Sequence, residues 1–224
     1  MSDNQISPNS RDWLMLIGGS TYKFTLTGFY LVALVAILKK HGYSLNQLSW
    51  IHLIGSIEAA KVLFAALMER RPAGRFGRFR GWLLAATLGL SAVFGLMACT
   101  DITQNFPFLL ACCVLLSAMS AVYGCAMLGL SCIVLPHRER GFGGVIQTMA
   151  ARGGKMIGGA LVLWLYQEYG QTAAAGFMLA FSLLMLLQLL YYREPESPTA
   201  QGSWTALAAR LVSFWQQPEL SLIH

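Results

Sequence analysis

The sequence predicts an all-α membrane protein with six transmembrane helices and a C-terminal amphipathic helix that lies on the membrane surface. The first observation is composition: 56% of the 224 residues are hydrophobic and 12% are charged, whereas soluble domains carry about 25% charged residues. The second is a series of six apolar stretches, each near or above the ~20 residues with which a helix crosses a bilayer. The third is that most basic residues lie in short loops between those stretches, as membrane topology requires.

The six stretches are expected to be helices, because lipid cannot hydrogen-bond exposed backbone groups. They are Trp13–Leu38, Leu48–Met68, Trp82–Cys99, Phe106–Leu135, Gly143–Tyr166 and Thr172–Tyr192. Together they form a first unit, residues 1–192, and residues 193–203 are a polar linker to the C-terminal segment. Residues 204–216 place large apolar side chains at helical spacing, which predicts the interfacial helix. Residues 217–224 resemble the beginning of a missing seventh span.

The distribution of arginine and lysine predicts the orientation of the chain. One side of the expected bilayer carries ten arginines: Arg11, Arg70, Arg71, Arg75, Arg78, Arg80, Arg138, Arg140, Arg193 and Arg210. The loop residues of the other side include only two bases, Lys39 and Lys40. The positive-inside rule therefore places both termini in the cytoplasm. Because these bases lie in loops and not on one amphipathic face, the net charge of +6 does not indicate a nucleic-acid partner.

Charged residues inside the expected spans are costly and by default mark function. They are Lys23, Glu58, Lys61, Arg152 and Lys155. At about 1.5 Å per helical residue, all five fall within roughly one or two turns of one plane, which favours a polar cavity near the midplane, where transporters bind substrate. Four bases and one acid leave a local charge of +3, which favours an anionic substrate. The plainer alternative is that these charges join helices or reach the interface.

Weaker signals accompany these charges. Tyr22, Tyr123 and Gln147 could line the same cavity, although each alone is more often a packing or interfacial residue. Gly154 and Gly158 form a GxxxG pair, which lets another helix approach closely. The five cysteines lack metal-ligand spacing and are expected to be buried thiols, with no metal or cofactor. The sequence contains no HExxH or GxSxG motif, which argues against an enzyme.

Three stretches carry a family resemblance. Residues 69–84, ERRPAGRFGRFRGWLL, form an acid-arginine pair followed by a Gly-Arg-rich run, with Lys61 eight residues earlier. Residues 135–141, LPHRERG, form a Leu-Pro-x-x-Glu-Arg-Gly element, and residues 151–165 are ARGGKMIGGALVLWL. These stretches resemble the second loop, the fourth loop and the fifth span of the major facilitator superfamily, in its group of AmpG-type muropeptide permeases and acetyl-CoA transporters.

The resemblance implies a secondary transporter of the bacterial inner membrane that works by alternating access. It also implies a cytoplasmic gate network formed by Glu69, Arg70, Arg78 and Arg80. As the only carboxylate within the expected spans, Glu58 would be the proton carrier of a symporter.

The fourth span departs from the muropeptide permeases. Where they carry a Gln-Asp element and a further aspartate, this chain has Tyr123, Gly124 and Leu128. The loss of these acids favours the similar RhtX/FptX-type siderophore permeases, and an anionic ferric siderophore suits the buried bases. Uptake of a ferric siderophore is therefore the expected function. Muropeptide or anhydro-sugar transport of the AmpG type is the alternative, and a non-transporting membrane assembly or sensor protein is the second alternative.

The superfamily has twelve spans, with the substrate cavity between two six-helix halves, and this chain corresponds to the N-terminal half. Three explanations stay open: a truncated product, one half of a split transporter that pairs with a separately encoded second half, or a homodimer. The expected partners are thus the lipid bilayer, a small anionic solute and a further six-helix unit.

Overall fold

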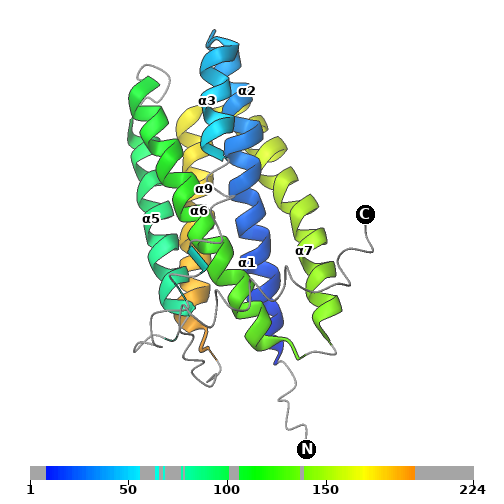
Figure 1. Ribbon diagram of the computed structural model, residues 1–224. Helices are drawn as coiled ribbons and strands as arrows, with labels where there is room; N and C mark the ends of the chain where they lie inside the picture. Colours follow the sequence, from blue (N-terminus) through cyan, green and yellow to red (C-terminus); the bar gives the residue numbers. More distant parts are fainter. Residues whose placement is uncertain are drawn as a thin grey trace, which may run out of the picture.

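The computed structural model describes residues 9–55, 64–65, 68, 77, 79–100, 106–136 and 139–194, and this part of the chain is a bundle of helices that run along a common axis (Figure 1). In chain order the elements are α1 (Ser10–Gly28), η1 (Phe29–Ala33), α2 (Leu34–Lys40), α3 (Leu45–Gly55), α5 (Arg80–Cys99), α6 (Phe106–Val134), α7 (Arg140–Lys155), η4 (Met156–Leu161), α8 (Val162–Tyr169) and α9 (Gln171–Tyr191). The segments η1 and η4 are π-helical turns that join the α-helices on either side.

Four helical segments are long and apolar enough to cross a membrane, namely Ser10–Lys40, Arg80–Cys99, Phe106–Val134 and Gln171–Tyr191. They confirm the first, third, fourth and sixth expected spans. The helical run of residues 140–169 has the length of a span but carries Arg152 and Lys155, and it is not among the four. The second expected span is described as a helix at its start, in α3, and most of its remainder lies outside the described residues.

The first and last helices are joined at the end of the bundle where α1 begins. Asn9 caps α1 in a capping box, in which its backbone N–H donates to Asp12 Oδ2 at 2.9 Å. The other carboxylate oxygen of Asp12 accepts a hydrogen bond of 2.9 Å from the hydroxyl of Tyr192, directly after α9. One carboxylate therefore stabilises the start of α1 and holds the end of α9 beside it.

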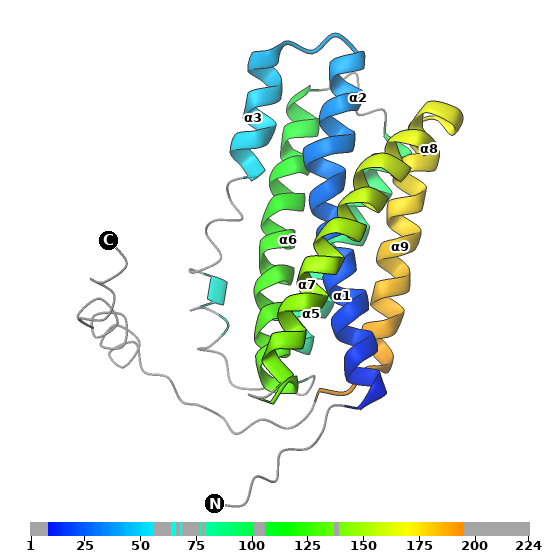
Figure 2. The same ribbon diagram turned by 90° about the vertical axis from the view of Figure 1, so that its right-hand side faces the viewer.

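The first and fifth expected spans are in close contact where the helical run that contains α7 crosses α1 (Figure 2). A Cβ atom on Gly154 would lie 2.7 Å from the carbonyl oxygen of Thr21, and one on Gly158 would overlap the carbonyl oxygen of Thr25. Gly158 lies in η4, and η4 also packs against η1. The expectation that the GxxxG pair admits a neighbouring helix is confirmed, since only glycine leaves room for backbones at this separation.

The cysteines are partly buried and partly exposed. All five thiols are free; Cys112, Cys113 and Cys125 are buried, but Cys99 and Cys132 are exposed. The expected burial is therefore wrong for these two, because Cys99 lies at the last turn of α5 and Cys132 on an outward face of α6. The expected linker begins within the described chain, whereas the interfacial helix at 204–216 and the tail at 217–224 lie outside it.

Candidate functional site

Lys23 lies in the middle of the first span, where α1 packs against α6. It lies on α1, is half-buried, and extends its side chain along α6 where Gly124 has no side chain. Its ammonium nitrogen lies 5.0 Å from the centroid of the Phe24 ring, a distance at which the ring face attracts a cation. The charge is thus held between two spans and not at the lipid interface.

Arg152 and Lys155 lie at the same level of the bundle as Lys23. Gly154, between them, packs against the backbone of Thr21 and Thr25, the turn of α1 that contains Lys23. At about 1.5 Å per residue, the backbones of all three bases fall within roughly one helical turn along the axis. Both side chains on α7 are exposed. Three cations are therefore assembled at one depth, two of them on an uncovered face.

The other residues of the predicted cavity have different surroundings. Tyr22 and Tyr123 are fully buried, with their rings in an edge-to-face contact at 5.3 Å. The hydroxyl of Tyr123 has no hydrogen-bond partner among the described residues. Gln147 is half-buried on α7. Glu58, Lys61, Glu69, Arg70 and Arg78 lie outside the described residues.

Tyr22 belongs to a chain of hydroxyl groups that joins three helices. Its oxygen lies 2.7 Å from Ser182 Oγ on α9, which lies 2.7 Å from Ser91 Oγ on α5. Ser91 also donates to the carbonyl oxygen of Thr87 at 2.9 Å. Each hydroxyl has one proton, so the three bonds form together only if Tyr22 donates to Ser182 and Ser182 donates to Ser91. Tyr22 is therefore anchored toward the outer helices α5 and α9.

Arg80, predicted to belong to a gate, lies in the first turn of α5 and reaches across to the end of α9. Its Nε donates to the carbonyl oxygen of Leu189 at 3.0 Å, and its Nη2 donates to that of Leu190 at 2.9 Å. These are carbonyls of the last helical turn, which lack partners within their own helix. Arg80 thus caps α9.

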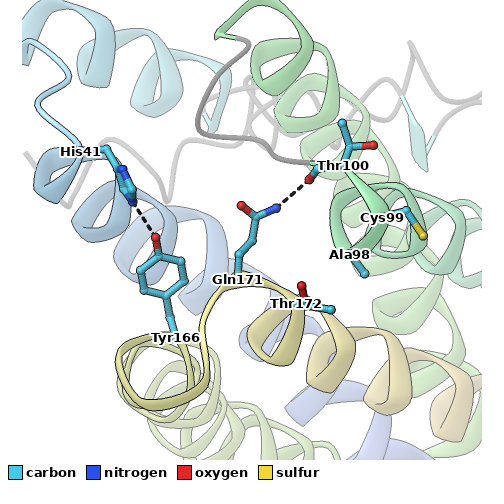
Figure 3. A pocket seen from close by; sticks show the side chains of 7 residues that line it. All are labelled: His41, Ala98, Cys99, Thr100, Tyr166, Gln171 and Thr172. Atoms are coloured by element: carbon cyan, nitrogen blue, oxygen red, sulfur yellow. Dashed lines mark hydrogen bonds between the residues drawn. The ribbon is translucent and has the colours of Figure 1, made fainter.

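A polar pocket of about 390 Å³ lies at the opposite end of the bundle from the start of α1 (Figure 3). It is lined by His41, Ala98, Cys99, Thr100, Tyr166, Gln171 and Thr172. His41 Nε2 and the Tyr166 hydroxyl are 2.6 Å apart, which joins the end of α2 to α8. Gln171 Nε2 donates to the carbonyl oxygens of Met97 and Thr100 at the end of α5. These bonds connect helix ends, and the lining of the pocket contains none of the three bases.

Comparison with known proteins agrees with this arrangement of helices. Residues 16–222, nearly the whole chain, match the Major Facilitator Superfamily. The chain belongs to the Major Facilitator Superfamily. It is thus a multi-pass membrane protein of a transporter family and not of an enzyme family.

Relatives within the superfamily include the anhydromuropeptide permeases of Escherichia coli K12 and of Escherichia coli O157:H7. Each is 27% identical to this chain over 219 residues. The alignment covers 96% of this chain but 44% of each permease. The chain therefore spans less than half the length of these relatives.

Several residues that contact Lys23 or Tyr22 in the structure were not predicted from the sequence. Gly124 was noted only for the acid it replaces, and its contact with Lys23 was not predicted. Ser91 and Ser182, which hold Tyr22, were not singled out. The two serines could have been found as hydroxyl groups in the middle of apolar spans, because such a group needs a hydrogen-bond partner in lipid.

Proposed function

We propose that this chain forms the N-terminal half of a secondary transporter that moves an anionic solute across the bacterial inner membrane by alternating access. The observation that carries this proposal is the assembly of Lys23, Arg152 and Lys155 within about one turn of one level on α1 and α7. Like charges in a region of low dielectric constant repel each other, and a bound anion offsets that repulsion. Membership of a transporter superfamily supports the proposal.

The solute class we propose is an anhydromuropeptide or a similar sugar-peptide with carboxylate groups, because the two Escherichia coli relatives are named for that solute. The siderophore hypothesis drawn from the fourth span gains no support from these relatives. A ferric siderophore is therefore the competing solute in the test. A second six-helix half, or a second copy of this chain, would cover the exposed bases Arg152 and Lys155 and close the cavity.

The remaining assignments rest on the sequence. In this proposal both termini are cytoplasmic, Glu58 carries the coupling proton, and Lys61 joins the anion site. Glu69, Arg70, Arg78 and Arg80 close the cytoplasmic side. The buried Tyr22 and Tyr123 support the site from α1 and α6, and the half-buried Gln147 borders it from α7.

The test is uptake by membrane vesicles that contain the native gene product, with labelled anhydromuropeptide and labelled ferric siderophore offered separately. We expect Lys23→Met, Arg152→Met and Lys155→Met each to reduce anhydromuropeptide uptake about tenfold or more, since each removes a charge that pairs with the solute. Lys40→Met, at the end of α2, is the matched control and should transport normally. Normal uptake by all three variants would overturn the proposal, and uptake of the siderophore alone would change the solute class.

The second alternative, a membrane assembly or sensor protein, makes a different prediction. Neither solute would enter the vesicles, and the protein would copurify with a stable membrane partner. Uptake that depends on the three bases excludes it.

A further inference from the structure

Where α1 crosses α6, a lysine lies against a glycine. A Cβ atom on Gly124 would be 2.8 Å from Lys23 Cε and 3.2 Å from Lys23 Nζ. One residue earlier on each helix, the rings of Tyr22 and Tyr123 meet at 5.3 Å. The outer part of the lysine side chain therefore occupies the space that any other residue at position 124 would fill.

We propose that Gly124 is a positioning residue for Lys23, and that its lack of a side chain forms the slot that fixes the ammonium group for an anionic solute. The proposal rests on the proposed function, in which Lys23 binds the anion. In this inference Gly124, a residue on α6 that contacts Lys23, determines the position of the lysine ammonium group.

Neighbouring side chains limit the space for a displaced lysine on two sides. One turn earlier on the same face of α1, a Cβ on Gly19 would lie 2.6 Å from Met127 Sδ and 3.1 Å from the Tyr123 hydroxyl. Those two side chains of α6 therefore fill the space next to the slot on that side. The Phe24 ring lies on another side of the ammonium. A side chain at position 124 would push the lysine out of the α1–α6 contact and move its charge.

This contact predicts that a substitution at Gly124 moves Lys23 locally and does not unfold the protein. The atoms nearest to the Gly124 Cβ position are the far end of a flexible side chain, Lys23 Cε, Nζ and Cδ, and not backbone. Alanine also favours a helix more than glycine does. Gly124→Ala should therefore fold normally and differ from the parent protein in how it binds the solute.

The experiment measures KM and maximal rate for anhydromuropeptide uptake by the native gene product in vesicles. We expect Gly124→Ala to raise KM about tenfold, because a misplacement near 1 Å weakens a positioned contact strongly, and Gly124→Val to raise KM further. The matched control is Gly95→Ala on α5, where no described atom lies within 4 Å of the Cβ position. Melting temperature in detergent is measured for every variant to exclude misfolding.

Two further readouts separate positioning from packing. In a Lys23→Met background, Gly124→Ala should cause no additional loss of uptake, because the residue acts through the lysine. For a solute whose carboxylates are amidated, Gly124→Ala should leave KM close to the parent value.

The outcomes distinguish this inference from the function on which it rests. Loss of uptake in Lys23→Met with a normal KM in Gly124→Ala would overturn the positioning role and leave the proposed function intact. Equal losses from Gly124→Ala with and without Lys23 would also overturn it. Normal uptake in Lys23→Met would instead contradict the anion-binding role of the lysine, and the inference would fall with it.

Discussion

Arg80 and Glu194 cap each other's helix. The Arg80 guanidinium donates to carbonyl oxygens of the last turn of α9, and the Glu194 carboxylate, just after α9, accepts from the backbone N–H groups of Phe79 and Arg80 at 3.0 and 2.9 Å. The positive guanidinium meets the C-terminal end of α9 and the negative carboxylate meets the N-terminal end of α5, so both charges interact favourably with the helix dipoles. Gly77, at φ +87°, passes so close to this carboxylate that a side chain would overlap it.

The first prediction concerns this reciprocal cap. Glu194→Ala should lower the free energy of unfolding by about 1–2 kcal/mol, because N–H groups at the start of α5 lose a charged acceptor. Thermal unfolding in detergent measures the change. Glu168→Ala, at the exposed end of α8, is the control for removal of one acid. Equal melting temperatures for the two variants would contradict the capping role.

The second prediction concerns the hydroxyl chain. Ser182→Ala should destabilise the protein by about 1 kcal/mol, because the Tyr22 and Ser91 hydroxyls lose their shared partner. Ser49→Ala, which removes an exposed hydroxyl bonded only within its own helix, should have little effect. If Tyr22→Phe and Ser182→Ala act through one chain, the double variant should lose less stability than the sum of the single losses. Strict additivity would argue against the chain.

The third prediction concerns the glycine contact between the first and fifth spans. Gly158→Ala should destabilise the bundle by about 1–3 kcal/mol, because its Cβ would overlap the Thr25 carbonyl oxygen and force two backbones apart. Gly153→Ala lies in the same span with no described atom within 4 Å of its Cβ position, and should be tolerated. The two variants are compared by their yield of folded protein and by their melting temperature. A Gly158→Ala protein as stable as Gly153→Ala would show that the helices are not in backbone contact.

The fourth prediction concerns pH. Burial, followed by the hydrogen bond from its hydroxyl to Asp12, raises the pKa of Tyr192 above its ordinary value. The folded protein thus holds this proton more tightly than the unfolded chain does. This stabilisation is complete below the unfolded pKa of about 10 and is lost as pH rises above it, by at most about 1.4 kcal/mol per pH unit.

Melting curves of the parent and Tyr192→Phe across the alkaline range measure this effect. The parent should lose stability more steeply than the variant, which has no phenol proton to lose at this position. Parallel curves for the two proteins would refute the prediction.

The helix boundaries were predictable because one physical requirement dominates them. Backbone groups in lipid must bond within their own helix, so the length of an apolar run nearly fixes the helix. The third span, expected from Trp82, begins at Arg80 and ends at Cys99 as expected. The earlier start is stabilised by the Glu194 carboxylate, which accepts from the backbone N–H groups of Phe79 and Arg80, a long-range contact that no local pattern of residues encodes.

The side-chain contacts of the candidate site were harder to predict. A common depth for Lys23, Arg152 and Lys155 follows from counting residues along helices, and the structure brings these backbones to one level. Which faces of α1 and α6 meet is a property of helix rotation, and α6, which is apolar on nearly all sides, carries little signal for it. The contact of Lys23 with Gly124 therefore appears only in three dimensions.

The close backbone contact of Gly154 and Gly158 with α1 also limits how the helices that carry Lys23 and Arg152 can move relative to each other. Two backbones in direct contact have little room to move independently, so we expect these helices to tilt together. The backbones that carry Lys23 and Arg152 then keep a nearly fixed spacing through every tilt. In the proposed function the two attachment points therefore move as one unit, and only the flexible ends of the two side chains adjust to the solute.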